Sequence, residues 1–361
     1  MIPTTTADMT ATWLTNALRS AQAIDRATIT AVHTEAIGVG VGIMGDLTRA
    51  TLTYDRVEPA APASVIVKLT SPHEANRAQG IALGMYTAEI GFYRDLVART
   101  AVRVPQCYLA ELDTATGDFV ILLEDLSEHR AADQLIGMSL PQAEAAVAAL
   151  ADLHAGFWKR VDDLDWVPSV VHERIKMFAA AWPDLWASFS ARFADRLPEG
   201  AIAAGERIKD RYWDLMCTLG DSPWTLIHSD FRCDNLFFDT HAAPGEPSVI
   251  VIDWQTIARG PGAYDLAYVL GGSLPVSDRR EHEERLVRGY HDRLVDAGVR
   301  GYDFDHLWLD YRRSHMANTS VAVITGGTMD LANERGRELV GTLGARHFSA
   351  VLDLDALELL P

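Results

Sequence analysis

Short runs of alternating apolar and polar residues occupy the first third of the chain and predict a β-rich region. A short amphipathic helix is predicted first, at about residues 10–20, where apolar residues recur on one face. Strand-like runs then follow, separated by turns rich in glycine, proline or alanine: 29–37, 47–54, 64–69, 106–112 and 119–123. Residues 75–100 carry helical spacing instead. The pattern predicts a mostly antiparallel sheet with one further helix.

Beyond residue 124 the pattern changes to long helices. Helical spacing covers these segments: 141–158, 175–193, 201–219, 279–296 and most of the chain after 304. Two short strand-like runs, 225–227 and 248–252, each lead into a polar segment that contains aspartate. The sequence therefore predicts an α+β, two-lobed fold, with residues 1–124 as the N-terminal lobe and residues 125–361 as a helical C-terminal lobe.

Composition and charge narrow the possible functions. Of the 361 residues, 48% are hydrophobic and 23% charged, which is typical of a globular protein, and the formal net charge is −18. An acidic chain disfavours nucleic acid and anionic membranes as partners. Three scattered cysteines do not make a disulfide framework. No leader-like start and no apolar run of the roughly 18–20 residues that a membrane span needs is present, so a cytoplasmic location is expected.

Two segments carry the sharpest chemical signal. LIHSDFRCDNLFF occupies residues 226–238 and contains His228, Asp230 and Asn235 in the spacing H-x-D-x-x-x-x-N. VIVIDWQ follows at 249–255, with Asp253 directly after a β-branched run. Any one of these residues alone is usually a turn, capping or loop residue. All three at this spacing, each on a loop that follows an apolar strand, favour a functional site.

Phosphoryl transfer needs this set of side chains. A carboxylate orients the incoming hydroxyl and accepts its proton, and oxygen ligands hold Mg²⁺ against the phosphates. Because positioning and charge neutralisation supply most of the catalysis, few protein groups are required. We therefore expect Asp230 to be the catalytic base, and Asn235 and Asp253 to be the metal ligands.

HSDFRCDNLFFD and VIDWQ together resemble the catalytic and metal-binding segments of the aminoglycoside phosphotransferase, choline kinase and ecdysteroid kinase-like superfamily, usually H-G-D-x-x-x-x-N and I-D-[WF]. Further segments resemble the same superfamily: SVIVKL, YTAEIGFYRDL, FVILLEDLS, LADLHAGFW and GPGAYDLAYVL. The resemblance spans about residues 38–270. It implies a protein-kinase-like fold, ATP as co-substrate, Mg²⁺ as cofactor, and a small-molecule alcohol or amino alcohol as acceptor.

The resemblance also implies nucleotide-binding residues. Lys68 corresponds to the lysine that grips the α- and β-phosphates, with a helical glutamate beside it. Glu89 is the preferred partner and Glu74 the competitor, since Glu74 is closer in sequence. Glu124 and Leu126 lie in the inferred hinge, where main-chain groups would bind the adenine.

Two departures from the superfamily pattern affect loops. Ser229 replaces the usual glycine between His228 and Asp230, so the backbone conformation of this loop can differ from that of the superfamily. The glycine-rich turn reads G-x-G-x-G-x-x-G, unlike the kinase pattern, and is either a plain hairpin or a phosphate-covering loop in which Gly40 and Gly42 take part.

Four further residues near these motifs have less specific roles. His228 and His154 are interpreted as buried structural histidines. Asp265 is expected to brace the metal-binding loop or to cap the helix that begins there. Two interpretations of Arg232 stay open, contact with the transferring phosphate or a surface salt bridge.

The predicted function is phosphate transfer from ATP to a small-molecule hydroxyl, with a nucleotide-binding pseudokinase as the alternative. Only eight residues separate Asp253 from Gly262 and no A-P-E follows, which leaves no room for a protein kinase's activation loop. A metal-dependent hydrolase is disfavoured because a histidine-rich ligand set is missing. The motif wording resembles ecdysteroid kinase-like sequences more than resistance enzymes, so the acceptor is expected not to be an antibiotic. Most tryptophans of the helical region are expected in its core.

Overall fold

The computed structural model describes residues 2–38, 45–239, 242, 248–328 and 334–361. Contacts within the chain divide it into two compact units, each described by itself below. Unit 1 comprises Met1–Ala98, Val104–His129 and Ile252–Thr256, and unit 2 comprises Arg99–Arg103, Arg130–Val251 and Ile257–Pro361. Across the described ranges, no helix combines the length and apolar character needed to cross a membrane.

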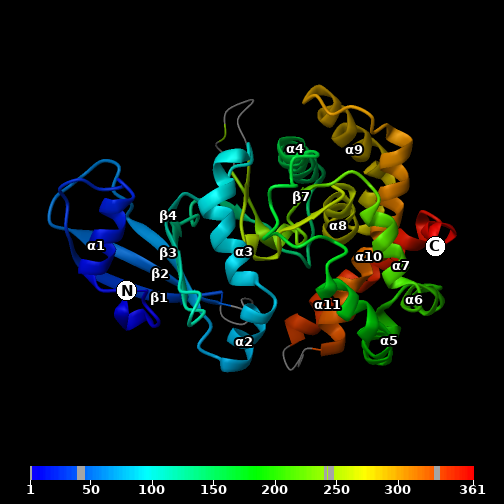
Figure 1. Ribbon diagram of the computed structural model, residues 1–361, viewed down its shortest axis with the longest axis horizontal. Helices are drawn as coiled ribbons and strands as arrows, with labels where there is room; N and C mark the ends of the chain where they lie inside the picture. Colours follow the sequence, from blue (N-terminus) through cyan, green and yellow to red (C-terminus); the bar gives the residue numbers. More distant parts are fainter. Residues whose placement is uncertain (1, 39–44, 240–241, 243–247, 329–333) are drawn as a thin grey trace. The chain divides into compact units, whose positions relative to one another are not determined.

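Unit 1 is built on a five-stranded antiparallel sheet with the strand order β1-β2-β3-β5-β4 (Figure 1). Its strands are β1 Ile29–Ile37, β2 Gly45–Tyr54, β3 Ser64–Thr70, β4 Cys107–Leu112 and β5 Phe119–Glu124. The five predicted strands are thus confirmed. β3 is the middle strand, and Lys68 pairs with Leu47 on β2 and with Ile121 on β5. Because both edges of β3 are hydrogen-bonded, the backbone that carries Lys68 is firmly held.

The helices of unit 1 differ from the prediction at one point. α1 (Ala11–Ser20) forms as predicted and is capped by Thr10, whose side chain accepts from the N–H of Trp13. The single helix predicted at 75–100 is interrupted, however. α2 (Glu74–Ala82) ends before Gly84, which has a φ of +66°, and α3 (Met85–Gly91) starts after it. The left-handed conformation, which glycine adopts without strain, breaks the helix.

The core of unit 1 lies between α1 and the sheet. Leu14 and Leu18 of α1 are completely buried, and so are Val65 and Val67 of β3. These residues belong to one hydrophobic cluster. The alternation of apolar residues along β3 therefore places one face of the strand in the core.

Unit 2 contains two small sheets that support loops. β7 (Thr225–Ile227) pairs antiparallel with β10 (Ala258–Gly260). A second sheet has the order β6-β8-β9, with these bounds: β6 Arg130–Ala131, β8 Leu236–Phe238 and β9 Val249–Val251. The two predicted strand runs form β7 and β9. β6, β8 and β10 were not predicted from the sequence.

Helices make up most of unit 2. They are α4 Leu140–Phe157, α5 Glu173–Phe193, α6 Ala201–Lys209, α7 Tyr212–Gly220, α8 Ala263–Ser273, α9 Val276–Asp296, α10 Phe304–Thr328 and α11 Glu334–Asp353. The segment predicted as one helix at 201–219 is divided into α6 and α7. α8 is almost entirely buried and packs against α4, α9, α10 and α11 (Figure 1). Trp182 and Trp186 of α5 are buried core residues, as expected for this region.

Candidate active site

Lys68 lies at the centre of a buried ion cluster in unit 1. Its Nζ is 2.7 Å from Oε2 of Glu89 and 3.1 Å from Oδ1 of Asp253. Glu89 comes from α3, whereas Glu74 is an exposed residue in the first turn of α2. Of the two glutamates considered from the sequence, Glu89 is therefore the one in contact with Lys68. The fold brings together three charged residues from positions 68, 89 and 253 of the chain.

The two carboxylates keep the lysine charged. Burial by itself lowers the pKa of Lys68, but the neighbouring Asp253 and Glu89 outweigh burial, and the pKa is raised above its ordinary value. The pKa of Glu89 is also raised, first by burial and further by the charge of Asp253, while Lys68 acts against both. Lys68 is therefore an ammonium ion at neutral pH, fixed by a short contact to Glu89.

A strained loop carries Asp253. The residue has a φ of +66°, in the left-handed region that non-glycine residues rarely adopt. Directly after it, Trp254 is completely buried and stacks on Phe92, with ring centroids 3.7 Å apart. Gln255 donates from Nε2 to Oδ2 of Asp253 over 3.2 Å. Packing of the neighbouring tryptophan and this hydrogen bond thus hold Asp253 in its unusual conformation.

The predicted hinge residues follow the last strand of the sheet. Glu124 ends β5, and its backbone N–H and its carboxylate both bond to the backbone of Gln106. Leu126 is buried, and its carbonyl accepts from the N–H of His129. Between them, Asp125 accepts from Arg49 over 2.8 Å and from Ser64 over 2.7 Å. Gly40 and Gly42, predicted to cover phosphates, lie outside the described residues.

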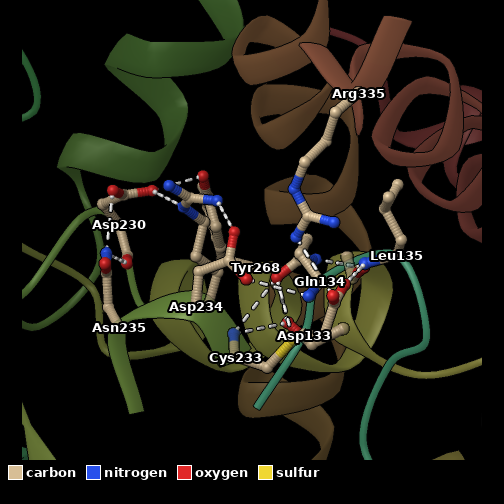
Figure 2. A network of polar contacts seen from close by, with 12 residues as sticks. Asp133, Gln134, Leu135, Asp230, Cys233, Asp234, Asn235, Tyr268 and Arg335 are labelled. Atoms are coloured by element: carbon tan, nitrogen blue, oxygen red, sulfur yellow. Dashed lines mark hydrogen bonds and ion pairs between the residues drawn. The ribbon is translucent and has the colours of Figure 1, made fainter. Parts of the chain in front are cut away.

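Asp230 of unit 2 is surrounded by hydrogen-bond donors (Figure 2). Its Oδ1 accepts from the hydroxyl of Tyr268 over 2.7 Å and lies 3.2 Å from Nε of Arg232. Its Oδ2 accepts from Nδ2 of Asn235 over 2.9 Å, and the same Nδ2 bonds the backbone carbonyl of Asp230. The H-x-D-x-x-x-x-N spacing thus closes a small loop in which the asparagine holds the aspartate.

Helix α8 holds the backbone of this loop. Asp265, the third residue of α8, accepts from the N–H of His228 over 2.6 Å and from the N–H of Ser229 over 2.9 Å. Asp265 therefore braces the loop that carries Asp230 and Asn235, the second of which is a predicted metal ligand. Ser229 has a φ of +65°. Serine thus occupies here a conformation that favours glycine, the residue usual in the superfamily.

Both histidines near the loop are completely buried. Nδ1 of His154 lies 2.7 Å from the hydroxyl of Tyr290, and its Nε2 lies 3.3 Å from Asp265. His228 accepts at Nδ1 from the N–H of Asp230. Neither side chain reaches the surface, so these contacts are consistent with the structural role inferred from the sequence.

Arg232 is clamped between two carboxylates of unit 2. Its Nη1 is 2.8 Å from Oδ2 of Asp234, in addition to the contact with Asp230. The other oxygen of Asp234 accepts from the N–H of Gln134. The arginine side chain is only 17% exposed. Of the two interpretations left open, the salt bridge therefore forms, although the side chain is mostly buried, and contact with the transferring phosphate stays a prediction.

Sequence reasoning missed several residues that support the loop. Gln134 is completely buried; its Oε1 accepts from the N–H of Cys233, and its Nε2 donates to the carbonyl of Gly272 over 2.6 Å. Arg346 of α11 donates to the carbonyls of Gln134 and Gly272. The role of Tyr268 could have been predicted, because it lies three residues after Asp265 and therefore on the same face of the helix. No sequence pattern indicated such a role for Gln134 and Arg346, since their partners are distant in the chain.

The described residues share their fold with small-molecule kinases. A protein from Ralstonia eutropha assigned as an aminoglycoside phosphotransferase superposes with a TM-score of 0.53 at 17% identity, covering 96% of this chain and 98% of that one. A microcompartment-associated aminopropanol kinase gives 0.51 at 11%, covering 93% and 95%. An aminoglycoside phosphotransferase complexed with GDP and kanamycin gives 0.52 at 14%, covering 86% and 90%. At these identities the likeness establishes the predicted kinase-like α+β fold.

The family follows from the sequence itself. The sequence model of the Ecdysteroid kinase-like family matches residues 40–299, which is well over half of the chain. The chain therefore belongs to the ecdysteroid kinase-like family, as its motifs indicated. A search among curated protein sequences gave no match.

Proposed function

We propose that the protein is an ATP- and Mg²⁺-dependent phosphotransferase that moves the γ-phosphate of ATP to a hydroxyl of a small molecule. The observation that carries this proposal is the cluster of Lys68, Glu89 and Asp253, because a charged, immobilised lysine beside a carboxylate from another loop is what nucleotide phosphates and their metal require. Membership of the ecdysteroid kinase-like family supports it.

In this proposal residues 1–124 form the nucleotide-binding lobe and residues 125–361 the lobe that carries the catalytic loop and the acceptor site. Lys68 neutralises charge on the α- and β-phosphates, and Glu89 holds its ammonium group in place. Main-chain groups at Glu124 and Leu126 bind the adenine. The N–H groups of Gly40 and Gly42 cover the phosphates, a role that glycine-rich backbone suits.

The predicted metal ligands, Asn235 and Asp253, suit Mg²⁺ better than a metal that is held entirely by protein side chains. Within the described ranges, no group of three or more His, Cys, Asp or Glu side chains is placed to hold a metal. Mg²⁺ takes one or two protein oxygens and fills its remaining positions with water and substrate phosphates. Asp253 offers a carboxylate, and Asn235 offers its amide oxygen, since its nitrogen is committed to Asp230. When bound, Mg²⁺ neutralises the charge that develops on the transferring phosphate.

Asp230 supplies the base chemistry. As the acceptor oxygen attacks the γ-phosphorus, its proton passes to the carboxylate of Asp230 and a new O–P bond forms. The bond between the γ-phosphorus and the bridging oxygen breaks, and ADP leaves with that electron pair. The Asp230 side chain is 25% exposed, which leaves room for a hydroxyl to approach it.

The acceptor that we propose is a small alcohol or amino alcohol other than an antibiotic, phosphorylated in the cytoplasm. The aminopropanol kinase with the same fold is named for an amino alcohol. The net charge of −18 favours cationic over anionic small molecules. The same charge disfavours nucleic acid as a partner.

Calorimetric titration with ATP, with and without Mg²⁺, tests the proposal. We expect Mg²⁺-dependent binding that Asp253→Ala weakens, followed by phosphate transfer to a member of an alcohol and amino-alcohol panel. Asp113→Ala is the matched control, because that aspartate also lies in unit 1 and its carboxylate accepts from N–H groups of its own turn. If neither ATP nor GTP binds to the wild-type protein, the proposal is wrong; if ATP binds but no acceptor is phosphorylated, the pseudokinase alternative replaces it.

A further inference from the structure

The two oxygens of Asp230 are not equivalent in this structure. A carboxylate oxygen has two lone pairs. Oδ1 accepts a hydrogen bond from the hydroxyl of Tyr268 over 2.7 Å and forms an ion pair with Nε of Arg232, 3.2 Å away. Oδ2 accepts one hydrogen bond, from the amide of Asn235 over 2.9 Å. Oδ1 therefore faces both a hydroxyl donor and a guanidinium, whereas Oδ2 has one amide donor and no cation in contact among the described residues, so Oδ2 is the oxygen better placed to take a proton.

We infer that Tyr268 is a positioning residue that fixes Asp230 so that Oδ2, and not Oδ1, receives the proton of the acceptor hydroxyl. This inference rests on the proposed function and adds to it the reacting atom and the residue that selects it. Tyr268 acts through Asp230 and has no direct part in the transfer.

The tyrosine can do this because its own position is fixed. Tyr268 is 1% exposed, and its ring meets that of His347 edge-on, with centroids 5.7 Å apart. Burial, and then the charge of Asp230, raise the pKa of Tyr268 well above its usual value, so its hydroxyl remains a donor. A carboxylate only accepts, so the direction of this hydrogen bond is unambiguous.

The helix that carries Tyr268 is itself aligned with the loop. Asp265 at the start of α8 bonds the N–H groups of His228 and Ser229, and Ser273 at its end accepts from the N–H of Cys233 over 3.1 Å. Tyr268 lies between these two attachments. Helix and loop are therefore joined on both sides of Asp230, and the tyrosine hydroxyl has little freedom to follow a rotating carboxylate.

Arg232 does not replace Tyr268 in this role. Its guanidinium is pulled towards Asp234, with the shorter contact of 2.8 Å against 3.2 Å to Asp230. Without the tyrosine hydroxyl, Oδ1 regains a lone pair, and the carboxylate can turn either oxygen towards the acceptor. Only one of several orientations of the Asp230 carboxylate would then be productive. The rate of phosphate transfer should therefore fall, while nucleotide binding is unaffected.

Tyr268→Phe removes the hydroxyl and keeps the ring. We expect kcat to fall by about 10- to 100-fold, the size of one hydrogen bond to a charged group, with KM for ATP unchanged. In an Asp230→Asn background the same substitution should have no further effect, because the tyrosine acts only through that carboxylate. A residue with a merely structural role would lower the rate in both backgrounds.

Tyr302→Phe is the matched control, because the hydroxyl of Tyr302 donates to Oδ2 of the buried Asp310 over 2.8 Å, a bond of the same type outside the catalytic loop. ADP release from MgATP is measured with water as acceptor, and then with the first panel alcohol that raises the rate. A wild-type protein without turnover overturns the proposed function, and this inference with it. If the wild type turns over but Tyr268→Phe matches Tyr302→Phe, only the inference is overturned.

Discussion

The two units arrange their functional charges in opposite ways. In unit 1 one cation, Lys68, is shared by two carboxylates, the buried Glu89 and the partly exposed Asp253. In unit 2 one carboxylate, Asp230, is held by three donors, of which only Arg232 is charged. Removing Lys68 leaves the buried carboxylate of Glu89 without its cation, whereas the partly exposed Asp230 tolerates the loss of a neutral donor. Function and stability should therefore be coupled in unit 1 and separable in unit 2.

Asp230→Ala tests whether function and stability are separable in unit 2, and it has the largest expected effect on the rate of turnover. We expect turnover to fall by about 10²- to 10⁴-fold, the usual contribution of a general base. Binding of MgATP and the free energy of unfolding should change little, because the Asp230 side chain is partly exposed. Single-turnover kinetics and calorimetric titration measure the two quantities. A variant with wild-type turnover would remove Asp230 as the base.

Lys68→Met tests the coupled side. It leaves Glu89 and Asp253 without their cation, and we expect a loss of about 3–5 kcal/mol in the free energy of unfolding together with impaired use of nucleotide. Urea denaturation and ATP titration measure these losses.

Lys176→Met is the control for Lys68→Met. Lys176 lies 3.7 Å from Glu173, and the two side chains are 55% and 79% exposed. Removing that exposed pair should cost about 1 kcal/mol or less. Equal losses in the two variants would contradict the coupling of charge and stability in unit 1.

Acid should change the stability of the two units in opposite directions. His315 and His347 of unit 2 are completely buried. Burial, and then nearby arginines, lower the pKa of His347 to about 3, and burial likewise lowers that of His315. Because the unfolded chain binds these protons from about pH 6.5 downward and the folded chain does not, stability falls as the pH drops below that value, by up to about 1.4 kcal/mol per pH unit for each histidine.

In unit 1 the raised pKa of Glu89 acts in the other direction, since protonation becomes easier in the folded state than in the unfolded state. Hydrogen exchange at pH 7 and pH 5 should therefore show α10 and α11 losing protection before β3 and β5. The variant His347→Gln should reduce that loss, while the exposed His306→Gln should not. Equal loss of protection in both units would contradict this difference.

Ser229→Gly has the smallest expected effect. Glycine adopts the φ of +65° without strain, so the substitution should leave kcat unchanged and stabilise the protein by about 1 kcal/mol or less. Ser190→Gly within α5 is the control and should destabilise by about 0.5–1 kcal/mol, as glycine does in a helix interior. Thermal unfolding measures both changes. A fall in kcat for Ser229→Gly would instead assign the serine side chain a role in the loop.

Much of the fold was accessible from the sequence because its signals are local. The five strands of unit 1 and most helices of unit 2 follow from the periodicity within each segment, and α4 begins close to residue 141, where the predicted helix begins. The errors are local as well. The left-handed Gly84 splits a predicted helix, and the short strand Ala258–Gly260 was not predicted.

The sequence by itself determined the loop that carries Asp230 and Asn235, because these two residues are five positions apart in one segment and hydrogen-bond to each other. It also narrowed the partner of Lys68 to two glutamates. Only the tertiary structure decided between them, directed Asp265 towards the loop that carries Asp230, and placed Tyr268 and Gln134 beside that loop. The reason is physical: a contact between residues tens or hundreds of positions apart depends on how whole elements pack, and no pattern within either segment records that packing.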